Sequence, residues 1–118
     1  MQRRAFRAVA LAAAAAHERL RPGVPACDID RLARQTIAAE GFADAQPMRT
    51  GHGLGFSGGS EAPQLGAADT TPLAAGMVVS IEPSICVAGF GGVCWADNFV
   101  VTEDGARRLS DYPVLDVG

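Results

Sequence analysis

The stretch Met77-Val-Val-Ser-Ile-Glu82 decides the fold of this 118-residue chain. Its β-branched run predicts a buried strand, because Val and Ile pack well on a pleated sheet. A second extended run covers residues 93–102, and glycine-rich turns at 88–92 and 103–105 precede and follow it. Turns of this kind favour hairpins. We therefore expect an antiparallel sheet that ends in a short strand over residues 107–109.

The first 41 residues have helical character. An Ala-rich run over residues 8–16 follows an arginine-bearing head, and alanine is the strongest helix former. Pro22-Gly23 should end this helix, and a second helix with apolar residues at helical spacing should end at Gly41. A secretion signal is the rival interpretation of the start, but the run has no leucine-rich centre. Helices followed by antiparallel strands predict the α+β class.

Composition excludes several classes of protein. Apolar residues make up 48% and charged residues 19%, which is typical of one globular domain. The net charge of −3 argues against a nucleic-acid partner, and no apolar run is long enough to span a membrane. The acids concentrate in residues 51–118, which suits a cation or a polar small ligand. We expect no nucleic-acid and no membrane partner.

Three cysteines, Cys27, Cys86 and Cys94, lack the spacing of a zinc knuckle or a disulfide framework. Free thiols predict a cytoplasmic protein. A bridge between Cys86 and Cys94 across the intervening turn is the minor alternative.

A glycine-rich segment surrounds one of the two histidines. Residues 53–58 match G-x-G-x-x-G, but no apolar strand precedes them and no helical pattern follows, so a dinucleotide site is not indicated. The glycines instead allow the backbone to pass close to a site. His52 lies directly before this motif, and its glycine neighbours suit an imidazole that acts as a ligand.

Glu82 is the last residue of the apolar strand expected over residues 77–82. A carboxylate buried there must be paired, hydrogen-bonded or metal-bound, because burial alone costs several kcal/mol. The alternative is that its side chain reaches water at the end of the strand.

Four segments, in order, resemble the C-terminal half of the "pita-bread" catalytic domain of creatinases, Xaa-Pro aminopeptidases and methionine aminopeptidases, an M24-type metallopeptidase family. They are Leu20-Arg-Pro-Gly-Val24, Arg49-Thr-Gly-His-Gly-Leu-Gly55 with Glu61-Ala-Pro63, Leu73-Ala-Ala-Gly-Met-Val-Val-Ser-Ile-Glu-Pro83, and Gly91-Gly-Val-Cys-Trp-Ala-Asp-Asn-Phe-Val-Val-Thr-Glu-Asp-Gly105. The resemblance implies that residues 1–118 form one partial pita-bread domain. Two N-terminal helices would pack on a curved antiparallel sheet.

Membership implies a two-metal hydrolase that uses manganese, cobalt or zinc, held by two Asp, one His and two Glu. By position, His52 would be the histidine ligand and a catalytic residue, and Glu82 would be one of the glutamate ligands. The second glutamate falls at Ala96, which cannot bind a metal. The two aspartates belong to the family's preceding half.

Other positions also depart from the family pattern. Cys94 replaces an arginine, Ser60 and Met48 stand at two histidine positions, and Ser84 replaces a glycine.

Three aspartates and one cysteine are candidate replacements for the missing ligands. Asp97 should point away from the site, because neighbouring strand residues face opposite sides. Asp28 and Asp30, expected in the first turn of the second helix, have no motif support. A metal site formed by His52, Glu82 and Cys94 is the remaining alternative.

The residues therefore predict a truncated or degenerate family member. The resemblance implies that its parent chemistry is two-metal hydrolysis of an N-terminal Xaa-Pro peptide bond. We expect this activity to be weak or absent in this chain, which would then bind a divalent metal weakly or bind none. One alternative is a metal-free, creatinase-like C–N hydrolase that acts on a small amide through His52 and Glu82. The other is a non-catalytic binding module. It would pair with a second copy or with a missing N-terminal half, because a half-domain exposes sheet edges and apolar surface.

Overall fold

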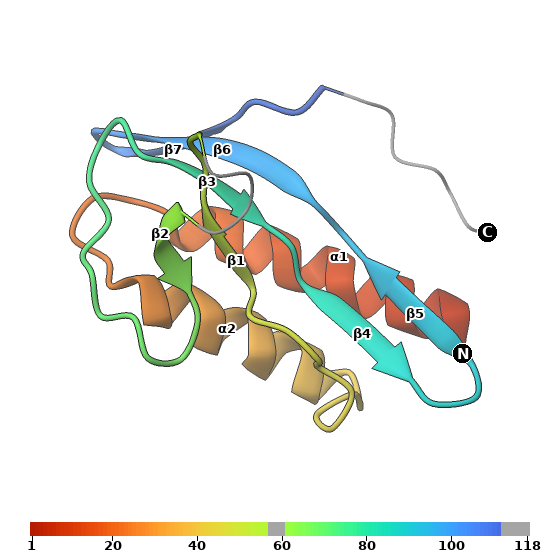
Figure 1. Ribbon diagram of the computed structural model, residues 1–118. Helices are drawn as coiled ribbons and strands as arrows, with labels where there is room; N and C mark the ends of the chain where they lie inside the picture. Colours follow the sequence, from red (N-terminus) through yellow and green to blue (C-terminus); the bar gives the residue numbers. More distant parts are fainter. Residues whose placement is uncertain (57–60, 112–118) are drawn as a thin grey trace.

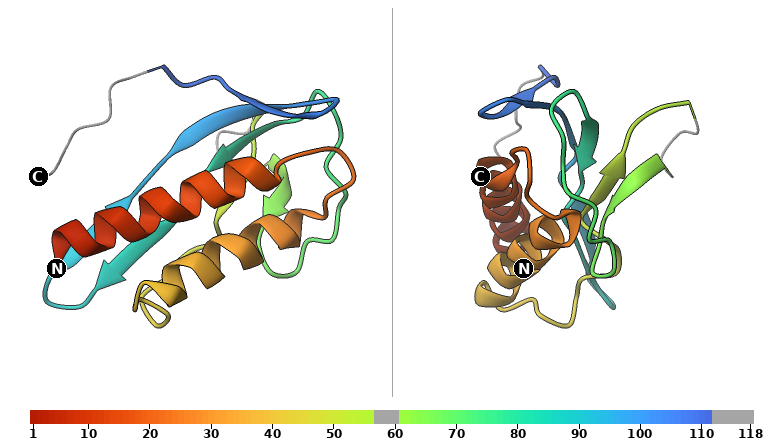
Figure 2. Two further views of the ribbon diagram at one scale, coloured as in Figure 1. Left: turned by 180° about the vertical axis from the view of Figure 1, so that it is seen from behind. Right: turned by 90° about the vertical axis from the view of Figure 1, so that its left-hand side faces the viewer.

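In the computed structural model, which describes residues 1–56 and 61–111, two helices cover one face of an antiparallel sheet (Figures 1 and 2). The elements are α1 (Gln2–Arg19), α2 (Ala26–Ala39), β1 (Gly51–Gly53), β2 (Glu61–Leu65), β3 (Val78–Ile81), β4 (Ser84–Val87), β5 (Gly91–Cys94), β6 (Asp97–Thr102) and β7 (Gly105–Arg108). The arrangement confirms the predicted α+β class and helical start.

The two helices pack through small side chains. Ala8, Ala12 and Ala16 of α1 are fully buried, which lets α1 lie close to α2 and to the sheet. Gly41 follows α2 with φ of 96°, a left-handed conformation that glycine adopts without steric cost, so the predicted end of the helix is confirmed. Within the described residues, neither helix has the length and apolar character needed to cross a membrane.

Five strands form the main sheet in the order β2-β1-β3-β6-β7, and β4 and β5 form a separate antiparallel pair. The two sheets share one register. β3 and β6 pair up to Ile81 opposite Asp97, and β4 and β5 resume with Ser84 opposite Cys94. Continuing either register places Glu82 opposite Ala96. The predicted run 93–102 is thus split into β5 and β6 at a short irregular step.

Residues 46–72 are rich in Gly, Pro, Ser and Thr, a composition that predicts a long loop, but they contain β1 and β2, so this prediction is wrong in part. The reason lies in the glycines of β1, which lies between β2 and β3. A Cβ atom on Gly51 would lie 1.9 Å from the carbonyl oxygen of Ser80, and one on Gly53 would lie 2.2 Å from that of Ala62. The close strand contacts therefore demand glycine, which strand propensity alone marks as a turn.

The G-x-G-x-x-G motif is not followed by a helix in the described chain. β1 ends at Gly53 and β2 begins at Glu61, while Gly58 lies outside the described residues. The described chain therefore lacks the helix that would follow a dinucleotide-binding loop.

Candidate functional site

The candidate site lies on the sheet face turned away from the helices. Val79 and Phe99 belong to the core cluster formed with the helices. Their strand neighbours Ser80 and Asn98 lie opposite each other, and His52 of β1 lies opposite Ser80. Because side chains alternate along a strand, these three residues share the other face. Glu82, two residues after Ser80, lies on that same face.

The structure brings the two predicted ligands together. Nε2 of His52 lies 3.1 Å from Oε1 of Glu82, and the His52 side chain is only 7% exposed. The hydroxyl of Ser80 donates a hydrogen bond of 2.8 Å to the same Oε1 atom. Glu82 is therefore paired and hydrogen-bonded, and its side chain is also 27% exposed, so both sequence expectations hold in part.

The other ring nitrogen of His52 fixes its tautomer. Nδ1 lies 2.8 Å from the carbonyl oxygen of Gly53, which can only accept, so Nδ1 carries a proton. Nε2 is therefore the ring atom available to exchange a proton or to bind a metal.

The segment opposite Glu82 supplies no carboxylate to the site. The methyl side chain of Ala96 cannot bind a metal, and Asp97 is buried on the helix side. Nε of Arg108 lies 3.1 Å from Oδ1 of Asp97, and the indole N–H of Trp95 donates to Oδ2 at 2.7 Å. Asp97 points away from the site, as predicted, and holds β5, β6 and β7 together.

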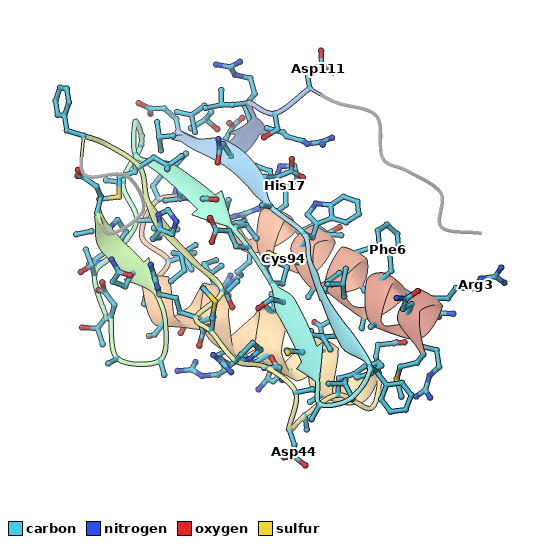
Figure 3. The ribbon with its side chains drawn as sticks, turned by 45° about the vertical axis from the view of Figure 1, so that its right-hand side comes forward. Arg3, Phe6, His17, Asp44, Cys94 and Asp111 are labelled. Atoms are coloured by element: carbon cyan, nitrogen blue, oxygen red, sulfur yellow. The ribbon has the colours of Figure 1, made fainter. Side chains whose placement is uncertain are left out.

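Cys94, labelled in Figure 3, lies near the backbone of Glu82 rather than its carboxylate. Its sulfur lies 3.9 Å from the backbone carbonyl oxygen of Glu82. Burial raises the pKa of the Cys94 thiol, and the charge of Glu82 raises it further.

The alternative of a disulfide bond between Cys86 and Cys94 is not borne out by the structure. Both thiols are free, and Cys86 lies opposite Gly92.

The donor set does not fit a two-metal centre. In the described ranges 1–56 and 61–111, no three His, Cys, Asp or Glu side chains are arranged as metal ligands. His52 and Glu82 supply two donors, and the open alternative with Cys94 gains no geometric support. Met48 is 55% exposed, and Ser60 lies outside the described residues.

Asp30 is the residue whose importance the sequence did not reveal. The first turn of α2 contains Asp28 alone, so the expectation that Asp30 acts there on the helix dipole was wrong. Its carboxylate is 1% exposed and accepts hydrogen bonds from Thr50 and Arg34. The spacing of Asp30 and Arg34, four residues apart on one helix, was the available signal.

The chain is similar to known peptidases in both sequence and structure. The model of metallopeptidase family M24 matches residues 1–103. YkvY of Bacillus subtilis (strain 168) is 44% identical over 108 residues, which is 92% of this chain and 30% of that protein.

Two solved structures share the fold. Prolidase from Pyrococcus furiosus superposes with a TM-score of 0.91 at 36% identity, covering 96% of this chain and 33% of the prolidase. Dipeptidase PepE from Mycobacterium ulcerans gives 0.86 at 41% identity, covering 92% and 29%. The two-helix and sheet arrangement therefore matches half of a pita-bread domain, and the chain spans about a third of the length of these relatives.

Proposed function

Because the chain belongs to metallopeptidase family M24, we propose that it is a degenerate relative of the prolidases and dipeptidases, with weak or absent metal-dependent hydrolysis of Xaa-Pro peptides. The observation that carries this proposal is the pair of positions 82 and 96. Glu82 is paired with His52, whereas the residue opposite Glu82 in the shared strand register is Ala96.

The size of the deficit supports this proposal. A catalytic zinc normally has three protein ligands, and His52 and Glu82 are two. Loss of even an outer-shell group lowers metal affinity by about 10–100-fold. We therefore expect this chain to bind Mn²⁺, Co²⁺ or Zn²⁺ weakly.

A gain-of-function pair tests the proposal. Ala96→Glu places a carboxylate opposite Glu82, and Ala96→Gln is its matched uncharged control. Calorimetric titration with Mn²⁺ and Zn²⁺ should show weak binding to the unaltered chain and to Ala96→Gln. Binding to Ala96→Glu should be at least about tenfold tighter. A stoichiometric, sub-micromolar site in the unaltered chain, or its chelator-sensitive hydrolysis of an Xaa-Pro dipeptide, would overturn the proposal.

A second candidate is a metal-free, creatinase-like C–N hydrolase. The fixed tautomer of His52 and its contact with Glu82 favour it, because such a pair can accept and return a proton. The substrate would be a small amide or amidine. Activity toward such compounds in the presence of EDTA should disappear in His52→Ala and persist in His17→Ala. Activity that persists in His52→Ala would exclude this mechanism.

The third candidate is a binding module that pairs with a second copy or with a separate N-terminal half. The sheet face that carries His52 has no helix over it within the described chain, and β2 and β7 are edge strands (Figure 2). Light scattering at micromolar concentration should then give a dimer mass. A stable monomer would contradict the homodimer.

The proposed compartment is the cytoplasm, on the ground that Cys27, Cys86 and Cys94 are all free. Fractionation of cells that express the chain should recover it in the cytoplasmic fraction.

A further inference from the structure

We propose that Asp30 is a positioning residue for the His52–Glu82 pair and that it acts through Thr50. The inference rests on the proposed function only in taking this pair as the functional site.

The first step is the contact between α2 and the residue before β1. Oδ1 of Asp30 accepts the hydroxyl of Thr50 at 2.8 Å and its backbone N–H at 3.0 Å. The same N–H also reaches the carbonyl oxygen of Leu65 at 3.0 Å. Asp30 and Thr50 are 1% and 3% exposed, so no water replaces these bonds without local opening. One helix carboxylate thus fixes both the side chain and the backbone of Thr50.

The second step leads from Thr50 to both members of the pair. The backbone carbonyl of Thr50 accepts the N–H of Glu82. His52 is two residues further along the chain, in β1, and its backbone is held between β2 and β3. A shift of Thr50 therefore moves the imidazole and the carboxylate relative to each other, and their contact of 3.1 Å depends on both backbones.

Arg34 completes the link between the helix and this segment. Its Nε lies 3.0 Å from Oδ2 of Asp30, and its Nη2 donates to the carbonyl oxygen of Met48 at 2.7 Å. The helix therefore holds residues 48 and 50 at two points. The arginine also balances the buried charge of Asp30, which explains how a carboxylate can lie there.

The same helix offers a matched control. Asp28 also pairs with an arginine, since Nη1 of Arg31 lies 2.9 Å from its Oδ1. No hydrogen bond joins Asp28 to residues 48–53 in the described chain. A general effect of helix charge would appear in both aspartates, whereas a positioning role would appear only at Asp30.

The test measures the two imidazoles by NMR in metal-free protein. His17 of α1, labelled in Figure 3, contacts Phe99 and serves as the internal reference. In Asp30→Ala and Thr50→Val, the ring nitrogen shifts of His52 should move and its Nδ1–H signal should exchange faster, while those of His17 stay unchanged. Asp30→Asn and Thr50→Ser, which keep an acceptor and a donor, should restore most of the His52 signature. Asp28→Asn should have no effect.

Stability alone cannot produce this pattern. If Asp30→Ala and Thr50→Val lower the melting temperature but leave the His52 signals at their original positions, the positioning role is overturned. Should Asp30→Ala fail to fold, Thr50→Val decides, because it keeps the backbone hydrogen bond to Asp30.

A second arm separates this inference from the proposed function. In the Ala96→Glu background, Asp30→Ala should weaken Mn²⁺ binding by about tenfold or more, and Asp28→Asn should not. If Ala96→Glu gains no metal affinity, the metal proposal fails while the NMR arm still tests Asp30.

Discussion

Two segments of the same sheet face differ in the chemistry they bring to the site. On β1 and β3, an imidazole and a carboxylate lie 3.1 Å apart, with a tautomer and a hydroxyl that fix their geometry. On the opposite segment, Cys94 at the end of β5 carries a thiol whose pKa is raised, and Ala96 before β6 carries only a methyl group. One side of the site thus presents an imidazole and a carboxylate, and the other presents a thiol and a methyl group.

The backbone does not explain this difference. The register that places Ser84 opposite Cys94 also holds at Ile81 and Asp97, so both segments keep their relative placement. The fold depends on the helix face, where Asp97 is bonded to Arg108 and Trp95. The site lies on the other face. A half-domain can therefore match prolidase with a TM-score of 0.91 while the segment opposite Glu82 carries Ala96 and Cys94.

The largest expected effect tests how strictly β1 is fixed. Gly51→Ala would place a Cβ atom 1.9 Å from the carbonyl oxygen of Ser80, so the strands must separate. We expect a loss of about 4 kcal/mol or more in the free energy of unfolding, measured by urea denaturation. Gly105→Ala, which meets no atom within 4 Å, is the control and should cost far less. Equal losses would show that β1 is not specially constrained.

Much of the fold follows from local patterns, but the site follows only in part. Both helices and the strand around Ser80 can be predicted from the sequence, because apolar periodicity and the helix-ending Gly41 are local features of the chain. The pairing of His52 with Glu82 was suggested by motif resemblance, and the structure brings the two side chains together.

Contacts between residues that are distant in sequence could not be predicted from local patterns. The sequence of β1 resembles a turn because its glycines are required by close contacts with the backbones of Ser80 and Ala62, which are distant in sequence. Asp30 looks like a helix-dipole acid because its partner Thr50 is 20 residues away. Such constraints appear only once the strands and helices are assembled.

The second prediction asks whether the acid next to Ala96 belongs to the fold or to the site. Asp97→Ala removes the buried carboxylate that pairs with Arg108 and accepts the part-buried indole N–H of Trp95. The expected loss is about 1–3 kcal/mol in unfolding free energy, with no change in Mn²⁺ titration. Asp104→Ala on the exposed turn should change stability by less than about 0.5 kcal/mol. A loss of metal binding in Asp97→Ala would place Asp97 in the site.

The third prediction sharpens the contrast by repairing the deficient side. In the Ala96→Glu background, Glu82→Gln should weaken Mn²⁺ binding by about 10–100-fold, because it removes one of the carboxylates that face each other. Asp97→Asn in that background should leave the titration unchanged, since Asp97 points toward the helices. The reverse order of effects would mean that the metal binds on the helix side.

The smallest expected effect reports on the field that Glu82 exerts across the strands. The pKa of Cys94 is raised by burial first and by the charge of Glu82 second. At pH 8 its thiolate fraction should therefore be small and should increase as the pH rises. Glu82→Gln removes the charge and lowers the pKa of Cys94, so alkylation by iodoacetamide should become about two- to threefold faster, as mass spectrometry would measure. Cys86, exposed on β4, is the reference in the same protein and should react at an unchanged rate. If the Cys94 rate also stays constant, burial alone controls its pKa, and the two segments do not interact electrostatically.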